Sequence, residues 1–276
     1  GSDAFESAFN SSTMSTNQIT LPSTLETIGS YAFAYSKLKS IVLPGSVKTI
    51  GSAAFSGSYI QDITLPASMP LNTIESSVFS GSSLKSITLP NNITSIKSNA
   101  FYNCESLSTV TFNNGLQTIG SSAFSCTDSS YYYGNVLTEI TLPDSVTNIS
   151  SSAFARSKRL NTVTFGANLL EIGDSAFKEC ALSTVNFRGG SLTTIGNSSF
   201  ADCASLQTIS LPGSVTTMKP LAFSGSGLTS FTVPQSASKI DYGILYDCDG
   251  LDSITVAAGN SNFVVKEDAL YEVRNG

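Results

Sequence analysis

The five cysteines of this chain are spaced regularly, and their thiols are the first side chains to consider for chemistry. The cysteines follow a large apolar residue by two or three positions: Cys104 follows Phe101, Cys126 follows Phe124, Cys180 follows Phe177, Cys203 follows Phe200 and Cys248 follows Leu245. Cysteine-based metal sites use close pairs such as Cys-x-x-Cys, and the sequence has none. A thiol that recurs at one position of a periodic sequence is typical of a small buried residue. A disulfide between Cys180 and Cys203 is the alternative.

Groups for acid–base catalysis are scarce. The chain has no histidine, so the usual general base and the commonest zinc ligand are both missing. Paired carboxylates could hydrolyse glycosides, and Asp62 and Glu139 occupy equivalent positions before an inward isoleucine. They lie three periods apart, or about 14 Å at the usual strand spacing, which is too far for either glycosidase geometry. We therefore expect no enzyme and no catalytic residues.

A group of aspartates near the C-terminal end is the only other candidate for a metal site. Asp241, Asp247, Asp249 and Asp252 fall close together in the sequence, but their spacing matches no known calcium loop. We interpret them as a solvated acidic edge, and we expect neither a metal nor a cofactor.

Pairs of hydroxyl residues flank single aliphatic residues at regular intervals. The candidate binding residues are Thr109, Thr111, Thr162, Thr164 and Thr184, and the pattern continues through Asn186, Thr208, Ser210, Ser230 and Thr232. Threonine is a good strand former, so a solvated sheet face explains the pattern. A shallow protein-binding or carbohydrate-binding face is the functional alternative.

One insertion interrupts the periodicity. It covers about seven residues within 127–135 and contains Tyr131, Tyr132 and Tyr133 beside serine, glycine and asparagine. Insertions in repeat arrays form loops, often on the binding face, and tyrosine provides a large contact area at low entropic cost. The three tyrosines are therefore candidate ligand-binding residues, with an ordinary surface loop as the alternative.

These residues belong to a repeat. Successive units begin at Leu38, Ile60, Leu84, Leu107, Leu137, Leu160, Leu182, Leu206, Leu228 and Leu251, with spacings of 22, 24, 23, 30, 23, 22, 24, 22 and 23 residues. In the first of these units Ile41 and Leu43 are two residues apart and point to one side of a strand. Pro44 ends that strand, and Ala54-Phe55 follows a serine-rich turn. A period near 23 predicts a solenoid in which each unit is stabilised by stacking on its neighbours.

The pattern Leu-x-x-Ile-x-Leu-Pro-x-Ser-Val-x-x-Ile-Gly-x-x-Ala-Phe-x-x-Cys resembles the BspA-like class of leucine-rich repeats. The units from Leu84 to Cys104 and from Leu206 to Phe223 match it well. The resemblance implies an α/β fold: a right-handed leucine-rich-repeat solenoid with one parallel concave sheet and short helical or 3-10 turns on the convex side. We also expect Ile41, Ile63, Ile87, Val110, Ile140, Val163, Val185 and Ile209 to stack in one buried column.

The whole chain, 1–276, is expected to form this single solenoid. Residues 1–15 form an N-terminal partial repeat or cap, 16–250 the repeats, and 251–276 an atypical C-terminal repeat or hairpin beyond which the native chain continues. Gly1-Ser2 is typical of a cloning remnant, which predicts that a signal peptide has been removed. Four Asn-x-Ser/Thr sequons begin at Asn10, Asn92, Asn148 and Asn197, and they matter only in a eukaryotic source.

Composition narrows the class of partner. Charged residues are only 12% of the chain and the net charge is −6, so a basic stripe for nucleic acid is missing. The sequence contains no run of 18 apolar residues, so it predicts no membrane-spanning helix. The resemblance implies an extracellular or cell-surface protein that adheres to a protein or glycan ligand on a host or neighbouring cell. The alternatives are a carbohydrate-binding module of a nutrient-capture system and, third, a hydrolase.

Overall fold

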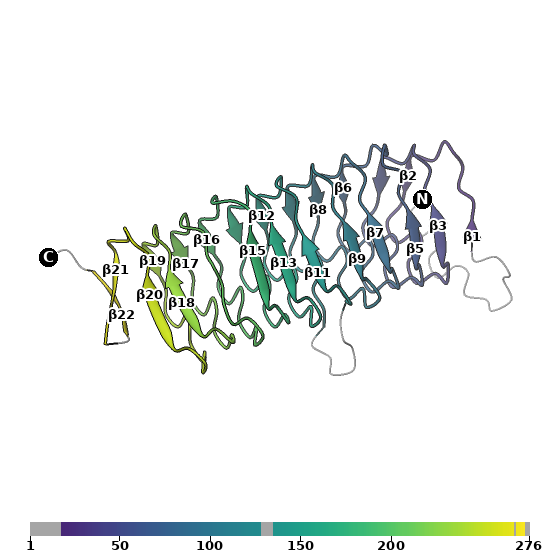
Figure 1. The fold of residues 1–276 in the computed structure, drawn as a ribbon. Helices are drawn as coiled ribbons and strands as arrows, with labels where there is room; N and C mark the ends of the chain where they lie inside the picture. Colours follow the sequence, from purple (N-terminus) through teal and green to yellow (C-terminus); the bar gives the residue numbers. More distant parts are fainter. Residues whose placement is uncertain (1–17, 128–134, 268, 274–276) are drawn as a thin grey trace.

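The computed structural model describes residues 18–127, 135–267 and 269–273. They form an elongated stack of parallel rungs, one rung for each sequence repeat (Figure 1). A complete rung contributes a strand to one row, a two-residue strand to a second row, and a turn that returns the chain to the first row. The rung that begins at Leu206 differs, because residues 207–210 form no strand in the first row. The leucine-rich-repeat solenoid expected from the sequence is confirmed at this level.

The first strand row contains the Leu-x-x-Ile segments of the repeat. Its strands are β1 (Gln18–Ile19), β3 (Ser40–Val42), β5 (Asp62–Thr64), β7 (Ser86–Thr88), β9 (Thr109–Thr111), β11 (Glu139–Thr141), β13 (Thr162–Phe165), β15 (Thr184–Phe187), β18 (Ser230–Val233) and β20 (Ser253–Val256). All pairings in this row are parallel and in register, for example Ile140 with Val163 and Val163 with Val185. The eight residues of the predicted column all contact the hydrophobic core, four of them fully buried and four partly buried.

A second strand row runs beside the first, and the expectation of one sheet did not include it. Its strands are β2 (Thr27–Ile28), β4 (Thr49–Ile50), β6 (Thr73–Ile74), β8 (Ser95–Ile96), β10 (Thr118–Ile119), β12 (Asn148–Ile149), β14 (Glu171–Ile172), β16 (Thr194–Ile195), β17 (Thr217–Met218) and β19 (Lys239–Ile240). From β2 to β4 and from β6 to β19, each inward isoleucine or methionine pairs with its counterpart in the next rung, as Ile195 does with Met218. β4 and β6 are not paired. A hairpin of β21 (Phe263–Lys266) and β22 (Ala269–Glu272) follows the last rung.

The turns carry a third set of contacts between rungs, which we call the turn row. Its centres are Phe33, Phe55, Phe79, Phe101, Phe124, Phe154, Phe177, Phe200, Phe223 and Leu245. In the Phe55 rung, the N–H groups of Ala53, Phe55 and Gly57 donate to carbonyls of the next rung at 3.0, 2.8 and 2.7 Å. The intervening N–H groups donate to the carbonyl three residues earlier. Every second N–H group of the turn therefore donates to a carbonyl of the next rung and not to a carbonyl of the same turn.

The expected helical or 3-10 turns are not confirmed. The described residues contain no helix, because a helix keeps its N–H groups within one segment whereas the turn row shares them with the next rung. Two residues four positions apart, such as Ala53 (φ 56°) and Gly57 (φ 62°), adopt the left-handed conformation on either side of the phenylalanine. They reverse the direction of successive N–H groups and make the alternation possible.

The centre of the rod is a column of stacked phenylalanine rings. Neighbouring rings from Phe33 to Phe223 have centroids 4.9 to 5.5 Å apart and interplanar angles of at most 14°. The glycine that precedes several turns fits between rungs, since a Cβ at Gly51 would lie 2.5 Å from the backbone nitrogen of Ser30. Gly51 does not adopt a positive φ, so the close approach of the two backbones is what favours glycine there.

Candidate interaction surface

The outward side chains of the first strand row form an exposed surface, which we call the strand face. Thr109, Thr111 and Thr184 are exposed on it, and Thr162 and Thr164 are partly buried. Among the described residues, the hydroxyls of Thr109, Thr111 and Thr184 make no hydrogen bond to another protein side chain or backbone group. These hydroxyls are therefore free to bond to a ligand or to water. The structure places all five sequence-predicted threonines on one face.

Hydrogen bonds along the strand face connect some of its side chains across rungs. The Thr232 and Thr255 hydroxyls lie 2.9 Å apart, and the Asn186 amide donates to the Thr164 hydroxyl at 3.4 Å. These bonds align the polar side chains in ranks with the spacing of the rungs. The face is thus a regular, mostly uncharged array of donors and acceptors.

A shallow hollow lies within this array. It has a volume of about 410 Å³ and is lined by Thr184, Asn186, Thr208 and Ser210, with Phe187 among its apolar lining residues. Phe187 is partly exposed and stacks on Phe165 at a centroid distance of 5.1 Å. Hydroxyl and amide groups around an aromatic ring are a chemistry suited to a polar ligand with an apolar face.

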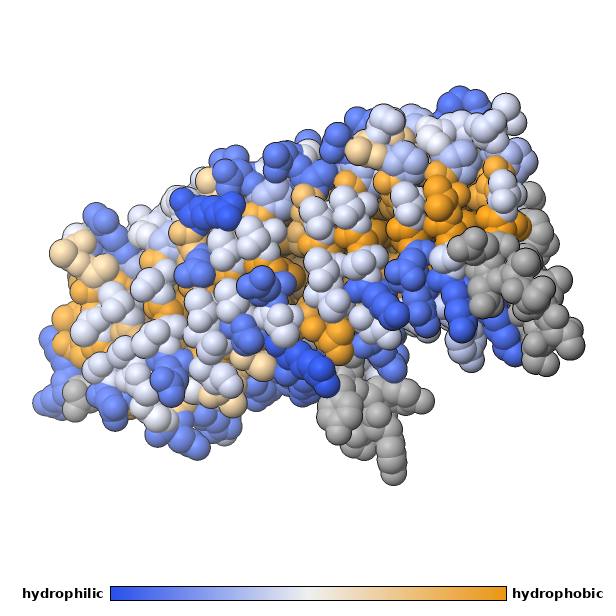
Figure 2. Space-filling model, turned by 45° about the vertical axis from the view of Figure 1, so that its right-hand side comes forward, coloured by the Kyte–Doolittle hydropathy of each residue, from blue (hydrophilic) through white to orange (hydrophobic). Residues whose placement is uncertain are grey.

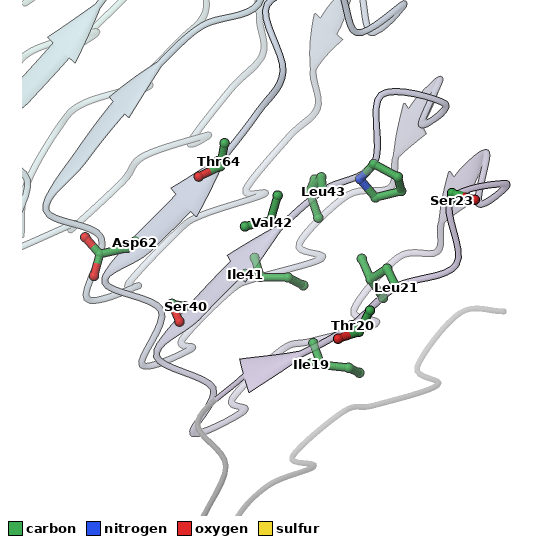
Figure 3. A pocket seen from close by; sticks show the side chains of 11 residues that line it. Ile19, Thr20, Leu21, Ser23, Ser40, Ile41, Val42, Leu43, Asp62 and Thr64 are labelled. Carbon is green, nitrogen blue, oxygen red and sulfur yellow. The ribbon is translucent and has the colours of Figure 1, made fainter.

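A second hollow occupies the N-terminal end of the strand face. It has a volume of about 470 Å³ and is lined by Ile19, Leu21, Val42 and neighbouring residues, with Asp62 and Thr64 at the side of β5 (Figure 3). The Val42 side chain is 65% exposed, which is unusual for a large aliphatic residue in a strand. Figure 2 shows hydrophobic residues gathered toward this end of the rod. The strand face therefore changes from apolar at β1–β3 to hydroxyl-rich in the rungs that follow.

The insertion predicted to bind a ligand lies largely outside the described residues, and this includes Tyr131, Tyr132 and Tyr133. The described residues on either side of it are firmly held. Thr127 donates from its backbone N–H and its hydroxyl to the Asn103 side chain at 3.1 and 3.2 Å. The Asn135 amide donates to the carbonyl of Phe124 at 2.8 Å and to the hydroxyl of Ser157 at 3.0 Å. Both ends of the insertion are thus fixed to the turn row.

The cysteines have structural surroundings, which confirms their interpretation as small buried residues. All five are free and buried. Cys104, Cys180, Cys203 and Cys248 each donate a thiol hydrogen bond to the carbonyl of the phenylalanine in the preceding rung, at 2.9 to 3.2 Å. Serine occupies the same position in other rungs, and the Ser58 hydroxyl donates within its own rung to the Phe55 carbonyl at 2.7 Å. The alternative disulfide between Cys180 and Cys203 is absent from the structure.

Burial also makes these thiols chemically inert. Loss of hydration raises the pKa of the Cys104 and Cys203 thiols to about 12, and raises that of Cys180 well above its usual value. The reactive species of cysteine is the thiolate, which these environments disfavour. The cysteines therefore support the fold and are poorly suited to nucleophilic or redox chemistry.

The acidic residues do not converge on a site. Asp62 and Glu139 lie on β5 and β11, with β7 and β9 between those strands in the row. Asp241 lies 3.8 Å from Lys239, and Asp247, Asp249 and Asp252 are exposed. In the part of the chain that the structure describes, no three histidine, cysteine, aspartate or glutamate side chains are placed to hold a metal ion. The same residues include no helix long and apolar enough to cross a bilayer.

Exposed tyrosines at the two ends of the rod were not predicted from the sequence. Tyr31, Tyr35 and Tyr59 are 48%, 56% and 55% exposed, and Tyr242 and Tyr246 at the other end are 74% and 61% exposed. They lie within four residues of the central residue of their turns, before it or after it. Equivalent positions in other rungs are not all exposed, since Ala53 and Ala201 are buried. Tyrosine where most rungs have a small or polar residue is the sequence signal that could have located them.

Comparison with known proteins agrees with this architecture. A model of the BspA-type leucine-rich repeat region matches residues 5–128 and 127–252. A leucine-rich repeat protein from Bacteroides ovatus is similar in structure, with 26% identity, a TM-score of 0.61, and coverage of 92% of this chain and 75% of that one. The pneumococcal vaccine antigen PcpA is 22% identical with a TM-score of 0.55, over 89% of this chain and 73% of its own, and shares the fold. Among curated protein sequences no significant match is found. The chain belongs to the family of BspA-type leucine-rich repeat proteins.

Proposed function

We propose that this protein is a cell-surface or secreted adhesion scaffold whose strand face binds a protein ligand on a host or neighbouring cell. The observation that carries the proposal is the strand face itself, with free hydroxyls at Thr109, Thr111 and Thr184 and an apolar hollow at its N-terminal end. A protein interface combines an apolar centre with a polar surround, and this face offers both on one rigid surface. The rungs of the family fold present such faces without rearrangement.

The experiment compares two variants of the whole chain for binding to immobilised matrix proteins and to intact epithelial cells. Thr109→Arg/Thr111→Arg places two bulky charges on the strand face. Gln117→Arg serves as the matched control, because Gln117 is exposed just before β10 in the second strand row of the same rung. The proposal predicts binding that falls at least tenfold in the double variant and is unchanged in the control. Equal binding by both variants would contradict it.

A carbohydrate ligand is the second candidate, and the hollow around Asn186 favours it. Asn186, Thr208 and Ser210 offer both donors and acceptors, and Phe187 offers a ring against which a sugar could pack. A glycan array would show selective binding that Asn186→Ala abolishes and Gln117→Arg leaves intact. Binding to proteins with no glycan selectivity would exclude this candidate.

The Tyr131–Tyr133 insertion stays a separate proposal for a binding hot spot. Its fixed ends at Thr127 and Asn135 support the expectation that replacing all three tyrosines with serine preserves the fold. Truncation of a tyrosine hot spot often costs about 2 kcal/mol or more in binding. The triple variant should therefore bind the identified ligand more weakly while its thermal unfolding is unchanged. Unfolding of the triple variant would identify the insertion as a structural element instead.

A further inference from the structure

The first strand row is interrupted inside the rod, between β15 and β18. Its strands pair as three separate groups, with the orders β1-β3-β5-β7-β9, β11-β13-β15 and β18-β20. The rung that begins at Leu206 lies between the last two groups, and its residues 207–210 form no strand (Figure 1). This rung carries the pattern Leu-x-x-Ile-x-Leu-Pro in full, so the residue types do not explain the interruption. We call this interruption the gap.

Backbone hydrogen bonds are missing on both sides of this rung. In a regular rung the residue that ends the strand donates its N–H to the next rung, as Leu142 does to the Thr164 carbonyl at 2.9 Å. Phe187 and Leu211 occupy the same position in their rungs, and neither N–H group donates to the rung that follows it. Residues 208–211 form no backbone hydrogen bond at all within the described part of the chain.

The other two rows cross the gap without interruption. In the second strand row β16 pairs with β17, and Ile195 lies in register with Met218. In the turn row the rings of Phe200 and Phe223 stack with centroids 5.5 Å apart, and the Phe200 N–H donates to the Ala222 carbonyl at 2.8 Å. The two rungs are therefore joined along two sides of the rod and parted along the third.

The length of one corner explains where the row parts. Ile195 follows Phe187 by eight positions, whereas the equivalent interval in the preceding rung, from Phe165 to Ile172, is seven. The second strand row is also interrupted, between β4 and β6, and the corner that leads from β5 to β6 is longer than seven positions as well. A longer corner shifts the following strand segment relative to its neighbour, so the strands no longer meet in hydrogen-bonding register.

Two glycines lie in the long corner. A Cβ at Gly189 would lie 2.2 Å from the carbonyl oxygen of Ala167, so this part of the corner packs tightly on the preceding rung. A Cβ at Gly190 would meet nothing within 4 Å, so this residue lies in open space. The extra length of the corner is therefore accommodated on the outside of the rod, where removing one residue disturbs no packed side chain.

The gap contains unfilled space. The hollow of about 410 Å³ on the strand face lies across it, since Thr184 and Asn186 line it from β15 and Thr208 and Ser210 line it from the next rung. All four of these side chains are exposed. The two sides of the gap have room to approach each other without a clash of buried groups.

We propose that the gap is a hinge at which the rod bends toward and away from the strand face. Bending in this direction changes the distance between rungs mainly in the first strand row, because the pairing of β16 with β17 and the stacked rings form the pivot. At other rungs the motion would stretch backbone hydrogen bonds, whereas residues 208–211 have none to stretch. Hinges are formed by a few loop residues that absorb the change in backbone angles, and Gly189 and Gly190 are suited to this role.

The hinge divides the strand face into parts that move relative to each other. The group β11-β13-β15 lies on one side and the group β18-β20 on the other. In the closed position the N–H groups of Phe187 and Leu211 would donate to the next rung as their counterparts do elsewhere. The curvature of the strand face would then be adjustable at this one place. This inference concerns the motion of the rod and does not depend on the function proposed for the strand face.

Distances between paired spin labels test the hinge in the whole chain. Labels attached through p-acetylphenylalanine avoid the native cysteines. One pair, at Thr141 and Thr232, lies on the strand face on either side of the gap. The control pair, at Thr147 and Ser238, lies in the same two rungs beside the second strand row, and both pairs are four rungs apart, or about 19 Å at the usual strand spacing. Double electron–electron resonance should give a distance distribution at least twice as broad for the first pair as for the control.

Deletion of Gly190 supplies the matched variant. It restores the corner to seven positions without removing a packed side chain, so it should close the gap and narrow the strand-face distribution to the width of the control. Insertion of one glycine after Ala167 lengthens the equivalent corner of the preceding rung and should broaden the distribution further. The insertion variant gives a second test if the deletion variant unfolds.

Hydrogen exchange measured by NMR gives an independent result. The amides of Phe187 and Leu211 should exchange at least tenfold faster than those of Leu89 and Leu142, which donate to the next rung from the same position. Deletion of Gly190 should slow the exchange of Phe187 and Leu211. Equal widths for the two label pairs, equal exchange of the four amides, or an unchanged strand-face distribution in a folded deletion or insertion variant would overturn the proposal.

Discussion

Replacing Phe124 with alanine should destabilise the rod more than any similar change at its surface. The Phe124 ring is fully buried, stacks on Phe101 at 4.9 Å and on Phe154 at 5.0 Å, and meets Phe112 edge-on at 6.1 Å. A buried Phe→Ala change costs about 3–5 kcal/mol through lost burial and the cavity left behind. Because the ring contacts both neighbouring rungs, we expect the cost to fall at the upper end of this range.

The matched comparison is Phe187→Ala. Phe187 also stacks on a ring, Phe165 at 5.1 Å, but it is partly exposed and lies outside the central column. Its truncation removes less buried surface and leaves a cavity open to water, so we expect about half the cost or less. Urea denaturation followed by circular dichroism gives both free energies of unfolding.

The shape of the transition provides a second measurement. A solenoid is stabilised by contacts between adjacent rungs, so a weakened interface in the middle divides it into two cooperative units. The Phe124→Ala transition should therefore broaden or separate into two steps, and hydrogen exchange should accelerate first in the rungs on either side of residue 124. A cost below about 1 kcal/mol, far under the usual range, or equal costs for the two variants would refute the role assigned to the column.

Three further predictions concern the turns and the titratable groups. Ser122→Gly should raise the free energy of unfolding by about 0.5 kcal/mol, because Ser122 has a left-handed backbone conformation (φ 54°) that glycine adopts without strain. The neighbouring change Ser121→Gly should lower the free energy of unfolding by a similar amount. Chemical denaturation of both variants measures the two changes. The buried thiols should resist a thiol reagent at neutral pH until the protein unfolds. Because burial raises their pKa, the stability that they contribute is present below about pH 9 and is lost as the pH rises toward 12. Melting temperatures measured across this pH range test the second expectation. Burial opposes ionisation of Glu179, but the hydrogen bond from Lys158 at 2.9 Å and the charge of Arg156 outweigh it and lower the pKa of the carboxyl. Glu179→Gln should therefore remove stability above pH 4.5 and make the melting temperature less sensitive to acid below that pH.

Much of the fold could be predicted because each repeat position has a single physical requirement. Ile140, Val163 and Val185 are aliphatic residues at nearly equal spacing, and a column of in-register strands satisfies that pattern. Pro44 and the serine-rich turns set where each strand ends. The period also located the cysteines in the core, since a residue fixed to the repeat is fixed to one side of the rung.

The turn row could not be predicted from one repeat. Its left-handed positions hold Ala53, Ser122, Leu221 and other residues with no preference for that conformation, because hydrogen bonds to the next rung impose it. Gly57, Gly81 and Gly225 at the second left-handed position, two residues after the phenylalanine, were the available clue. The local pattern predicts a helical or 3-10 turn, whereas hydrogen bonds between rungs determine the conformation.

The candidate site was only partly predictable for a related reason. Thr109, Thr111 and Thr184 were correctly placed on one outward face, since the alternation of a strand determines it. The apolar hollow around Val42 depends on how neighbouring rungs pack, which no single repeat reveals.

The direction of the hydrogen bonds between rungs has a mechanical consequence. They run along the length of the rod in all three rows, so a pull on the two ends loads a few of them at a time, at the terminal rung. The rod should therefore yield by peeling, one rung after another, and not by a single rupture. Each released rung of about 23 residues extends to about 75 Å, against a spacing of about 4.8 Å when stacked. A tether built in this way would absorb the work of detachment in many small steps and recover its length when the tension falls.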